Sequence, residues 1–362
     1  NNLDYDQSIE FMKNTGRNNY LLGFNDGLHN NIDEYFPELD GIKTYNIVGC
    51  SKPTIGKIYI LNKEKSGDYE YGLQYINGDG TVPLRSAEYL DADKKYYTNN
   101  VEHAYLPSAE GVKQLIVSIL SNNEENFDLD NYTNISSDDS ICSLAGIQIE
   151  YHSPIDLHIY DADGNHVGPD ANGDIDNKIE GAQYDIIDGN KFVFLPFGSF
   201  YKIEGRATDI GTFDAHIKII EDGECMRSVY FNEIPLLSTS TNIQILTNSQ
   251  EPVMQIDQDG DGFFESEREP DAFLDEEESQ DLDKPETVIN LSGNQGDGGW
   301  YKSNVEVSLS SQDNEGGAGI LKTEYSLDNG QNWIIYQQPF IIFQEGTTTV
   351  FYQAIDRTGN IE

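Results

Sequence analysis

The middle of the chain carries the pattern that most restricts its fold, a series of short segments in which apolar and polar side chains alternate. The segments read IQIEY, IDLHIYD, KFVFLP, YKIEGRAT and FDAHIKII, and turns rich in Asp, Asn and Gly separate them. A period of two places successive side chains on opposite faces of a β-strand. Short strands at this spacing predict an all-β sandwich over residues 140–250.

The chain of 362 residues is longer than one ordinary domain, so we expect several domains. Residues 1–125 mix helix and strand patterns, with a strand predicted at Lys43–Gly49 and an amphipathic helix at Ser108–Leu120. Ser108 is the expected N-cap of that helix. The apolar residues spaced to lie on one helix face are Val112, Leu115, Ile116 and Ile119.

Polar stretches divide the rest of the chain. Residues 126–139 are predicted to form a linker, and residues 251–286 hold 15 Asp and Glu against one Arg and one Lys. Such a charge density is typical of a solvated, self-repelling connector. A second β segment covers residues 287–362, with a hairpin turn predicted at Asp328–Gly330.

The charge balance excludes several classes of partner. Lys and Arg number 22 against 64 Asp and Glu, which gives a formal net charge of −42. Nucleic acids and anionic membrane surfaces are therefore not expected partners, because the cations that neutralise phosphates are scarce. Calcium, cationic partners or saline surroundings fit this acidity better. No apolar run reaches the roughly 18–20 residues that span a bilayer, and no signal peptide opens the sequence. Because the first residue is Asn, we expect a processed chain or a fragment.

One carboxylate and one histidine form the most informative pair. Asp79 lies between two glycines in YINGDGTVPLRSAEYL, after a segment that is predicted to be a strand, and His103 follows in VEHAYLPS before the predicted helix. An Asp on one strand-end loop can orient a His on a later loop, which then exchanges a proton with a nucleophile. The order Asp then His matches the last two members of a Ser…Asp…His triad. On pattern alone, a plain turn and a structural histidine remain the alternative.

The same stretches resemble a known family. GDGTVPLRSA resembles the acid-bearing loop of the lecithin:cholesterol acyltransferase-like lipases, an α/β-hydrolase family, and VEHAYLPSAEGVKQLI is similar to its histidine segment and closing helix. YNIVGCSKPTIG resembles the strand before the acid. The resemblance covers about residues 20–122. It implies that residues 1–125 are the C-terminal part of a hydrolase catalytic domain and that Asp79 orients His103 as the general base. The implied activity is that of a lipase, esterase or O-acyltransferase acting on lipid or ester substrates.

The sequence departs from that family at the nucleophile. No G-x-S-x-G motif occurs in the chain, and Gly49–Pro53, the nearest stretch, lacks the second glycine. We therefore expect this chain to be inactive alone, with its serine located before Asn1. Residues Asp6–Pro37 would form a cap. Some apolar residues of this segment are expected to line an acyl pocket, and the alternative is ordinary packing under the surface. They are Tyr20, Leu21, Leu22, Phe24 and Phe36.

The acidic connector contains a pattern of calcium ligands. Aspartates alternate in IDQDGDGFFESE before Gly262, at the spacing of positions 1, 3 and 5 of a calcium loop. Position 12 is Arg268 rather than the usual Glu, so the loop resembles those of bacterial surface proteins more than a full EF-hand. The alternative is an acidic linker without an ion. The predicted ligands of a structural Ca²⁺ are Asp257, Asp259, Asp261, the carbonyl of Phe263 and Glu265.

Cysteines and the remaining histidines carry weaker signals. Three cysteines are too few for a disulfide scaffold, and a bridge between Cys142 and Cys225 is conceivable only if the protein is extracellular. Cys50 is expected to be a small buried residue. His158 and His216 lie in strand patterns without evident partners, so we assign them no chemistry.

Two β segments resemble modules of surface proteins. SPIDLHIYDADGNHVG and GTFDAHIKII resemble β-sandwich modules appended to secreted bacterial hydrolases. Residues 287–362 are similar to Ig-like modules of bacterial and archaeal surface proteins. Trp300 and Trp333 are expected in the core of that module, with exposed platforms for carbohydrate stacking as the alternative.

These observations together predict a multidomain prokaryotic protein that is secreted or held at the cell surface. Its expected fold is partial α/β, the C-terminal half of an α/β-hydrolase, followed by an all-β sandwich and an Ig-like domain. A hypothesis of a different class is a non-catalytic surface adhesion protein with a remnant hydrolase domain. Such a protein would contact a cell surface or polysaccharide through its β-modules.

Overall fold

The computed structural model describes residues 41–362 apart from 64–68, 199, 222 and 248–251. The predicted cap at Asp6–Pro37, with its five proposed pocket residues, lies outside the described residues. Among the helices that are described, none has both the length and the apolar composition needed to cross a lipid bilayer.

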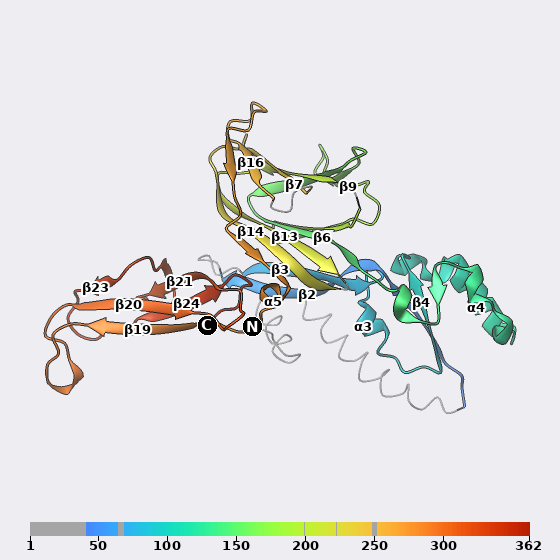
Figure 1. Cartoon of the computed structure of the whole chain (residues 1–362), viewed down its shortest axis with the longest axis horizontal. Helices are drawn as coiled ribbons and strands as arrows, with labels where there is room; N and C mark the ends of the chain where they lie inside the picture. Colours follow the sequence, from blue (N-terminus) through green and yellow to red (C-terminus); the bar gives the residue numbers. More distant parts are fainter. Residues whose placement is uncertain (1–40, 64–68, 199, 222, 248–251) are drawn as a thin grey trace.

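The described part of the protein is mostly β, with 48% of those residues in strands and 12% in helices. The strands form several separate sheets rather than one open parallel sheet (Figure 1). The expected C-terminal half of an α/β-hydrolase is therefore wrong. The expected order along the chain is present: a strand, the loop with Asp79, a second strand, His103 and a helix. The first of these strands is part of a separate antiparallel hairpin, however, and the second is part of a small three-stranded sheet.

A two-sheet sandwich forms the centre of the molecule. In spatial order, the first sheet contains β10 (Gln183–Ile187), β11 (Asn190–Pro196), β6 (Ala145–His152), β13 (Gly211–Glu221), β14 (Glu224–Leu236) and β18 (Ala272–Leu274). The second contains β17 (Ser266–Arg268), β16 (Met254–Asp257), β15 (Asn242–Leu246), β12 (Tyr201–Ala207), β7 (Ile155–Asp161), β8 (His166–Pro169) and β9 (Ile175–Asn177). Their inward side chains form one buried core that includes Ile149, Leu157 and Phe231. This core is the one that the alternating pattern predicts.

The sandwich extends beyond residue 250, into the predicted acidic connector. Strands β16 and β17 add to the edge of one sheet, and β18 pairs with β14 at the edge of the other. Met254, Ile256 and Leu274 are buried there. A few apolar side chains at the right spacing therefore outweigh the repulsion among the surrounding carboxylates.

A long hairpin covers the outer face of the first sheet. Strand β2 (Lys52–Lys63) pairs antiparallel with β3 (Tyr69–Gly78), and the hairpin runs below β6 and β13 in Figure 1. The Gln148 side-chain amide donates to the carbonyl of Leu73 at 2.6 Å and accepts from the Tyr75 N–H at 3.1 Å. The buried contact between hairpin and sheet contains Leu73, Tyr75, Leu144, Phe192, Phe194 and Ile220.

A small unit lies at one end of the hairpin. Its sheet contains β1 (Tyr45–Cys50), β4 (Lys94–Asn99) and β5 (Ile135–Ser136), with β1 and β4 parallel. The helices are α3 (Leu84–Ala87), a 3₁₀ turn at His103–Ser108 and α4 (Glu110–Leu120).

The predicted helix is present in this unit, but it starts later than expected. Val112 and Leu115 are buried as the spacing predicts, while the N-cap is Ala109. Ser108 belongs to the preceding 3₁₀ turn, where its hydroxyl donates to the carbonyl of Tyr105 at 2.8 Å. The predicted linker at 126–139 is packed, because apolar residues of this stretch contact the same cluster as α4; they are Phe127, Leu129, Tyr132 and Ile135.

The last module contains two three-stranded sheets. Its strands are β19 (Glu286–Ser292), β20 (Val305–Gln312), β21 (Ile320–Ser326), β22 (Ile334–Ile335), β23 (Phe340–Ile342) and β24 (Phe351–Asp356). The predicted turn connects β21 to β22, with Asn329 and Gly330 at φ of 63° and 77°. Trp300 is 60% exposed, so its assignment to the core is wrong. Trp333 is half-buried.

The structure pairs the cysteines differently from the sequence hypothesis. Cys50 and Cys142 form a disulfide with 5.4 Å between their Cα atoms, and Cys225 is a free thiol. Cys50 is buried as expected, but as part of this bridge. Spacing along the chain could not show the pairing, because the two residues are 92 positions apart and lie on different elements.

Candidate functional site

Asp79 and His103 meet at the end of β3. The Nδ1 atom of His103 lies 2.8 Å from Oδ2 of Asp79. The Asp79 side chain is 3% exposed, whereas that of His103 is 50% exposed. The backbone N–H of His103 also donates to the carbonyl of Asp79 at 2.8 Å. The two loops are therefore joined twice, with a buried carboxylate behind a half-exposed imidazole.

The second oxygen of Asp79 is fixed by its own loop. Oδ1 accepts from the N–H of Val82 at 2.7 Å and from that of Thr81 at 3.1 Å. Gly80 has a φ of +87°, which lets the chain turn sharply around the carboxylate. Both carboxylate oxygens are therefore occupied, and the one that faces His103 has a defined direction.

Gly49 lets the acid loop approach β1 closely. A Cβ atom at this position would lie 2.6 Å from Cβ of Asp79 and 2.9 Å from Cδ1 of Leu106. Distances this short require the neighbours to move. The glycine at this point of the sequence is thus needed for the position of Asp79 in the site.

The pair is suited to proton transfer. An ionised Asp that accepts from Nδ1 holds the imidazole in the tautomer whose Nε2 can take a proton, and it stabilises the cation that results. In the part of the chain that the structure describes, no hydroxyl or thiol is hydrogen-bonded to His103. The pair thus has the acid and the base of a triad, and its role in catalysis stays a prediction.

The predicted calcium ligands also come together. Carboxylate oxygens of Asp257, Asp259, Asp261 and Glu265 lie within 4.8 Å of one another. Asp257 is 1% exposed and the others are exposed. Burial opposes ionisation of Asp257, but the N–H groups of Gly260 and Gly262 outweigh it and hold the pKa of this carboxyl below its usual value. Four oxygen donors at one place fit a hard cation such as Ca²⁺.

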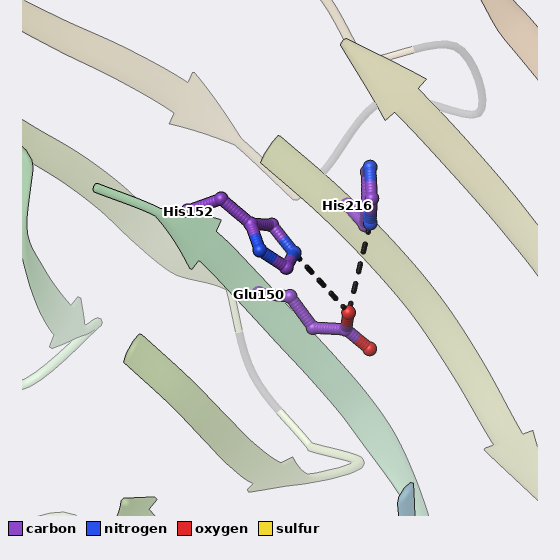
Figure 2. Close-up of side chains that lie close together, drawn as sticks. All are labelled: Glu150, His152 and His216. Carbon is purple, nitrogen blue, oxygen red and sulfur yellow. Dashed lines mark ion pairs between the residues drawn. The ribbon is translucent and has the colours of Figure 1, made fainter. Parts of the chain in front are cut away.

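Sequence reasoning missed a second cluster, made of Glu150, His152 and His216 (Figure 2). Glu150 and His152 alternate on β6, so they share one face of the sheet, and His216 on β13 lies opposite Glu150 in the strand register. The statement that His216 has no partner is thus wrong. The sequence signal for this cluster was the alternate spacing of Glu150 and His152 in IEYH, which places both on one face of a strand. The pairing of β6 with β13, which adds His216, cannot be read from either segment alone.

Burial and neighbouring charges shift the pKa values of side chains in this cluster. Desolvation would raise the pKa of Glu150, but the charge of Lys218 and the two histidines hold it well below the usual value. Burial lowers the pKa of His216. Oε1 of Glu150 accepts from Nε2 of Gln148 at 2.6 Å and from Lys218. Glu150 is therefore an anion inside the protein, with two donors on one of its oxygens.

Comparison with known proteins gives no identity. No family model, curated protein sequence or solved structure matches this chain.

Proposed function

We propose that Asp79 and His103 are the acid and the general base of a lipase, esterase or O-acyltransferase that acts on lipid or ester substrates. The observation that carries this proposal is the 2.8 Å contact between the buried carboxylate and the half-exposed imidazole. The serine that His103 would activate lies outside the described residues in this proposal.

The chemistry follows from the two environments. His103 would remove the proton of the serine as its oxygen attacks an acyl carbon, and would later donate that proton to the leaving alcohol. Asp79 would stay ionised and stabilise the imidazolium between these steps. General acid–base catalysis of this kind contributes roughly 10²–10⁴-fold to a rate.

The test is ester hydrolysis by the protein purified from its native source and by variants of the full gene product. We expect His103→Ala to lower kcat by at least about 10²-fold while the protein remains folded. Glu102→Gln is the matched control, because it alters the neighbouring exposed side chain, which contacts Lys52, and leaves the pair intact. Near-normal turnover of the His103→Ala protein would refute the assignment.

A second candidate function is supported by Trp300. This side chain is 60% exposed on the last module, as a platform for stacking on a sugar ring would be. The alternative is therefore a surface adhesion protein that binds polysaccharide and has no acyl-transfer activity. Pull-down on insoluble cell-wall polysaccharide, lost in Trp300→Ala and retained in Trp333→Ala, would favour it.

The loop at 257–265 is our proposal for a structural Ca²⁺ site. It is supported by the four carboxylates that converge within 4.8 Å. In a calorimetric titration, the wild-type chain should bind Ca²⁺ at this loop, and the Asp259→Asn/Asp261→Asn protein should bind one ion fewer. Asp163→Asn/Asp174→Asn is the control in another acidic turn. Equal stoichiometry in all three proteins would contradict the site.

We also propose that the protein is secreted or held at the cell surface of a prokaryote. The Cys50–Cys142 disulfide supports this, because such bonds persist in oxidising surroundings. Cell fractionation tests it, and recovery of the protein solely from the reducing cytoplasm would contradict it.

A further inference from the structure

The cluster of Glu150, His152 and His216 has the donor set of a transition-metal site. Two imidazoles and one carboxylate from β6 and β13 converge on the outer face of the first sandwich sheet (Figure 2). Glu150 is fully buried and His152 is 4% exposed. The nitrogen donors distinguish this group from the acidic calcium loop, because hard cations prefer oxygen ligands.

The distances are close to those that a bound ion needs. Nε2 of His152 lies 3.7 Å from Oε2 of Glu150, and Nδ1 of His216 lies 3.6 Å from the same oxygen. All three donor atoms lie within 4.8 Å of one another. Ligands of a tetrahedral zinc ion, with bonds of about 2.0–2.1 Å, are about 3.3 Å apart. Small rotations of the side chains would bring the three donors to that spacing.

A second observation points to a ligand between these side chains. Oε2 of Glu150 is buried and accepts no hydrogen bond from any residue in the described ranges. Leaving a buried carboxylate oxygen unsatisfied is costly, and native structures rarely do so without a bound group. The oxygen lacking a donor is the one that both histidines face.

The other oxygen of Glu150, Oε1, is held by hydrogen bonds of the kind that orient a metal-binding carboxylate. Oε1 accepts from Gln148 and Lys218, which fixes the plane of the carboxylate and directs Oε2 toward the histidines. Gln148, Lys218 and Tyr230 also line a cavity of about 540 Å³, and Tyr230 packs on the His216 ring. Residues that contact Glu150 and His216 therefore border this cavity.

We propose that Glu150 Oε2, His152 Nε2 and His216 Nδ1 bind one divalent transition metal ion, with Zn²⁺ as the preferred ion. The ion would link β6 to β13, and a fourth position would remain for water, hydroxide or another small ligand. An anionic fourth ligand would offset the positive charge that the ion adds beside Lys218. This site is independent of Asp79 and His103, so either proposal can fail alone.

The first test is metal content after dialysis against Zn²⁺ with excess Ca²⁺ to saturate oxygen-only sites. The wild-type chain should retain one equivalent of zinc. His152→Gln and His216→Gln should each retain less than a tenth of that amount at the same free zinc. The control is His158→Gln, which changes a different histidine pair whose Nδ1–Nε2 distance is 3.1 Å. Equal zinc in all four proteins, or none in the wild type, would overturn the proposal.

A second measurement does not depend on the folding of variants. X-ray absorption of the zinc-loaded wild-type chain should show two imidazole ligands and one or two oxygen ligands near 2.0 Å. Scattering from oxygen alone would place the ion on surface carboxylates and overturn the site. Zinc should also raise the unfolding midpoint of the wild type, because an ion that binds only the native state stabilises it.

Discussion

At the scale of single residues, a substitution of Gly49 tests whether the loop that carries Asp79 needs the space that this glycine leaves. A methyl group at this position would meet Asp79 at 2.6 Å, so Gly49→Ala should displace the loop. We expect about 1–3 kcal/mol of lost stability and a fall in ester turnover of at least about tenfold. Gly198→Ala is the control, because its Cβ would meet nothing within 4 Å. Urea unfolding and turnover that match the wild type would show that the loop tolerates the methyl group.

His158 gives a prediction for the dependence of stability on pH. Burial, followed by the charges of Arg206 and His166, lowers the pKa of His158 to about 4. The unfolded chain takes up this proton below pH about 6.5, whereas the folded chain resists until about 4, so stability falls as pH falls through that window.

Between pH 7 and pH 5, the wild-type chain should lose about 1–2 kcal/mol more than the His158→Gln protein, measured by urea unfolding at both pH values. Titratable groups that do not contact His158 contribute to both proteins and cancel in the difference. An equal loss in the two proteins would mean that His158 titrates as it does in water.

At the scale of elements, the contact between the β2–β3 hairpin and the sandwich depends on Tyr75. Its hydroxyl donates to Asp185 at 2.7 Å and lies 3.2 Å from the carbonyl of Phe192, and the ring is fully buried. Tyr75→Phe should cost about 1–3 kcal/mol of unfolding free energy, because the buried acceptors lose their donor. Tyr89→Phe, at a side chain that is 89% exposed, should cost nothing measurable. Equal midpoints for the two variants in chemical denaturation would contradict this account of the hairpin.

The elements also show what could be predicted from sequence. Alternation in IDLHIYD and FDAHIKII predicts strands because a sheet buries one face of each strand, and β7 and β13 are found there. The order of Asp79 and His103 suggested their contact because both flank strand ends. Pairing between distant strands is not encoded in a local period. The sequence therefore did not indicate that His216 faces Glu150, or that residues 254–274 complete the sandwich.

At the scale of the whole molecule, one covalent bond joins distant parts. The Cys50–Cys142 bridge connects β1 to the segment just before β6 and closes a loop of 92 positions. Alkylation under denaturing conditions should modify one cysteine, Cys225, before reduction and all three after it. Three modified cysteines without reduction would contradict the bridge.

The bridge should also matter for stability. Cys142→Ser should lower the unfolding free energy by about 2–4 kcal/mol, because a crosslink of this loop length restricts the unfolded chain. Cys225→Ser is the matched control, since it removes a thiol without a crosslink. Chemical denaturation of the two oxidised variants measures the difference, and equal free energies would argue against a stabilising bridge.

The expected fold class was less accurate than the local patterns on which it was based. Short motifs around Asp79 and His103 suggested half of an α/β-hydrolase, but residues 41–362, where the structure describes them, form six separate sheets and are rich in β-structure. Short motifs specify loops and the ends of elements, whereas the fold depends on which strands pair. The site geometry is therefore a better guide to function here than the fold that the motifs suggested.

The most direct test of the central claim is labelling with a fluorophosphonate, which reacts with an activated serine. Intact mass of the full gene product should show one covalent adduct in the wild type, with labelling slowed by at least about 10²-fold in His103→Ala and unchanged in Glu102→Gln. The absence of an adduct, or equal rates in the wild type and His103→Ala, would show that Asp79 and His103 do not serve a nucleophilic serine.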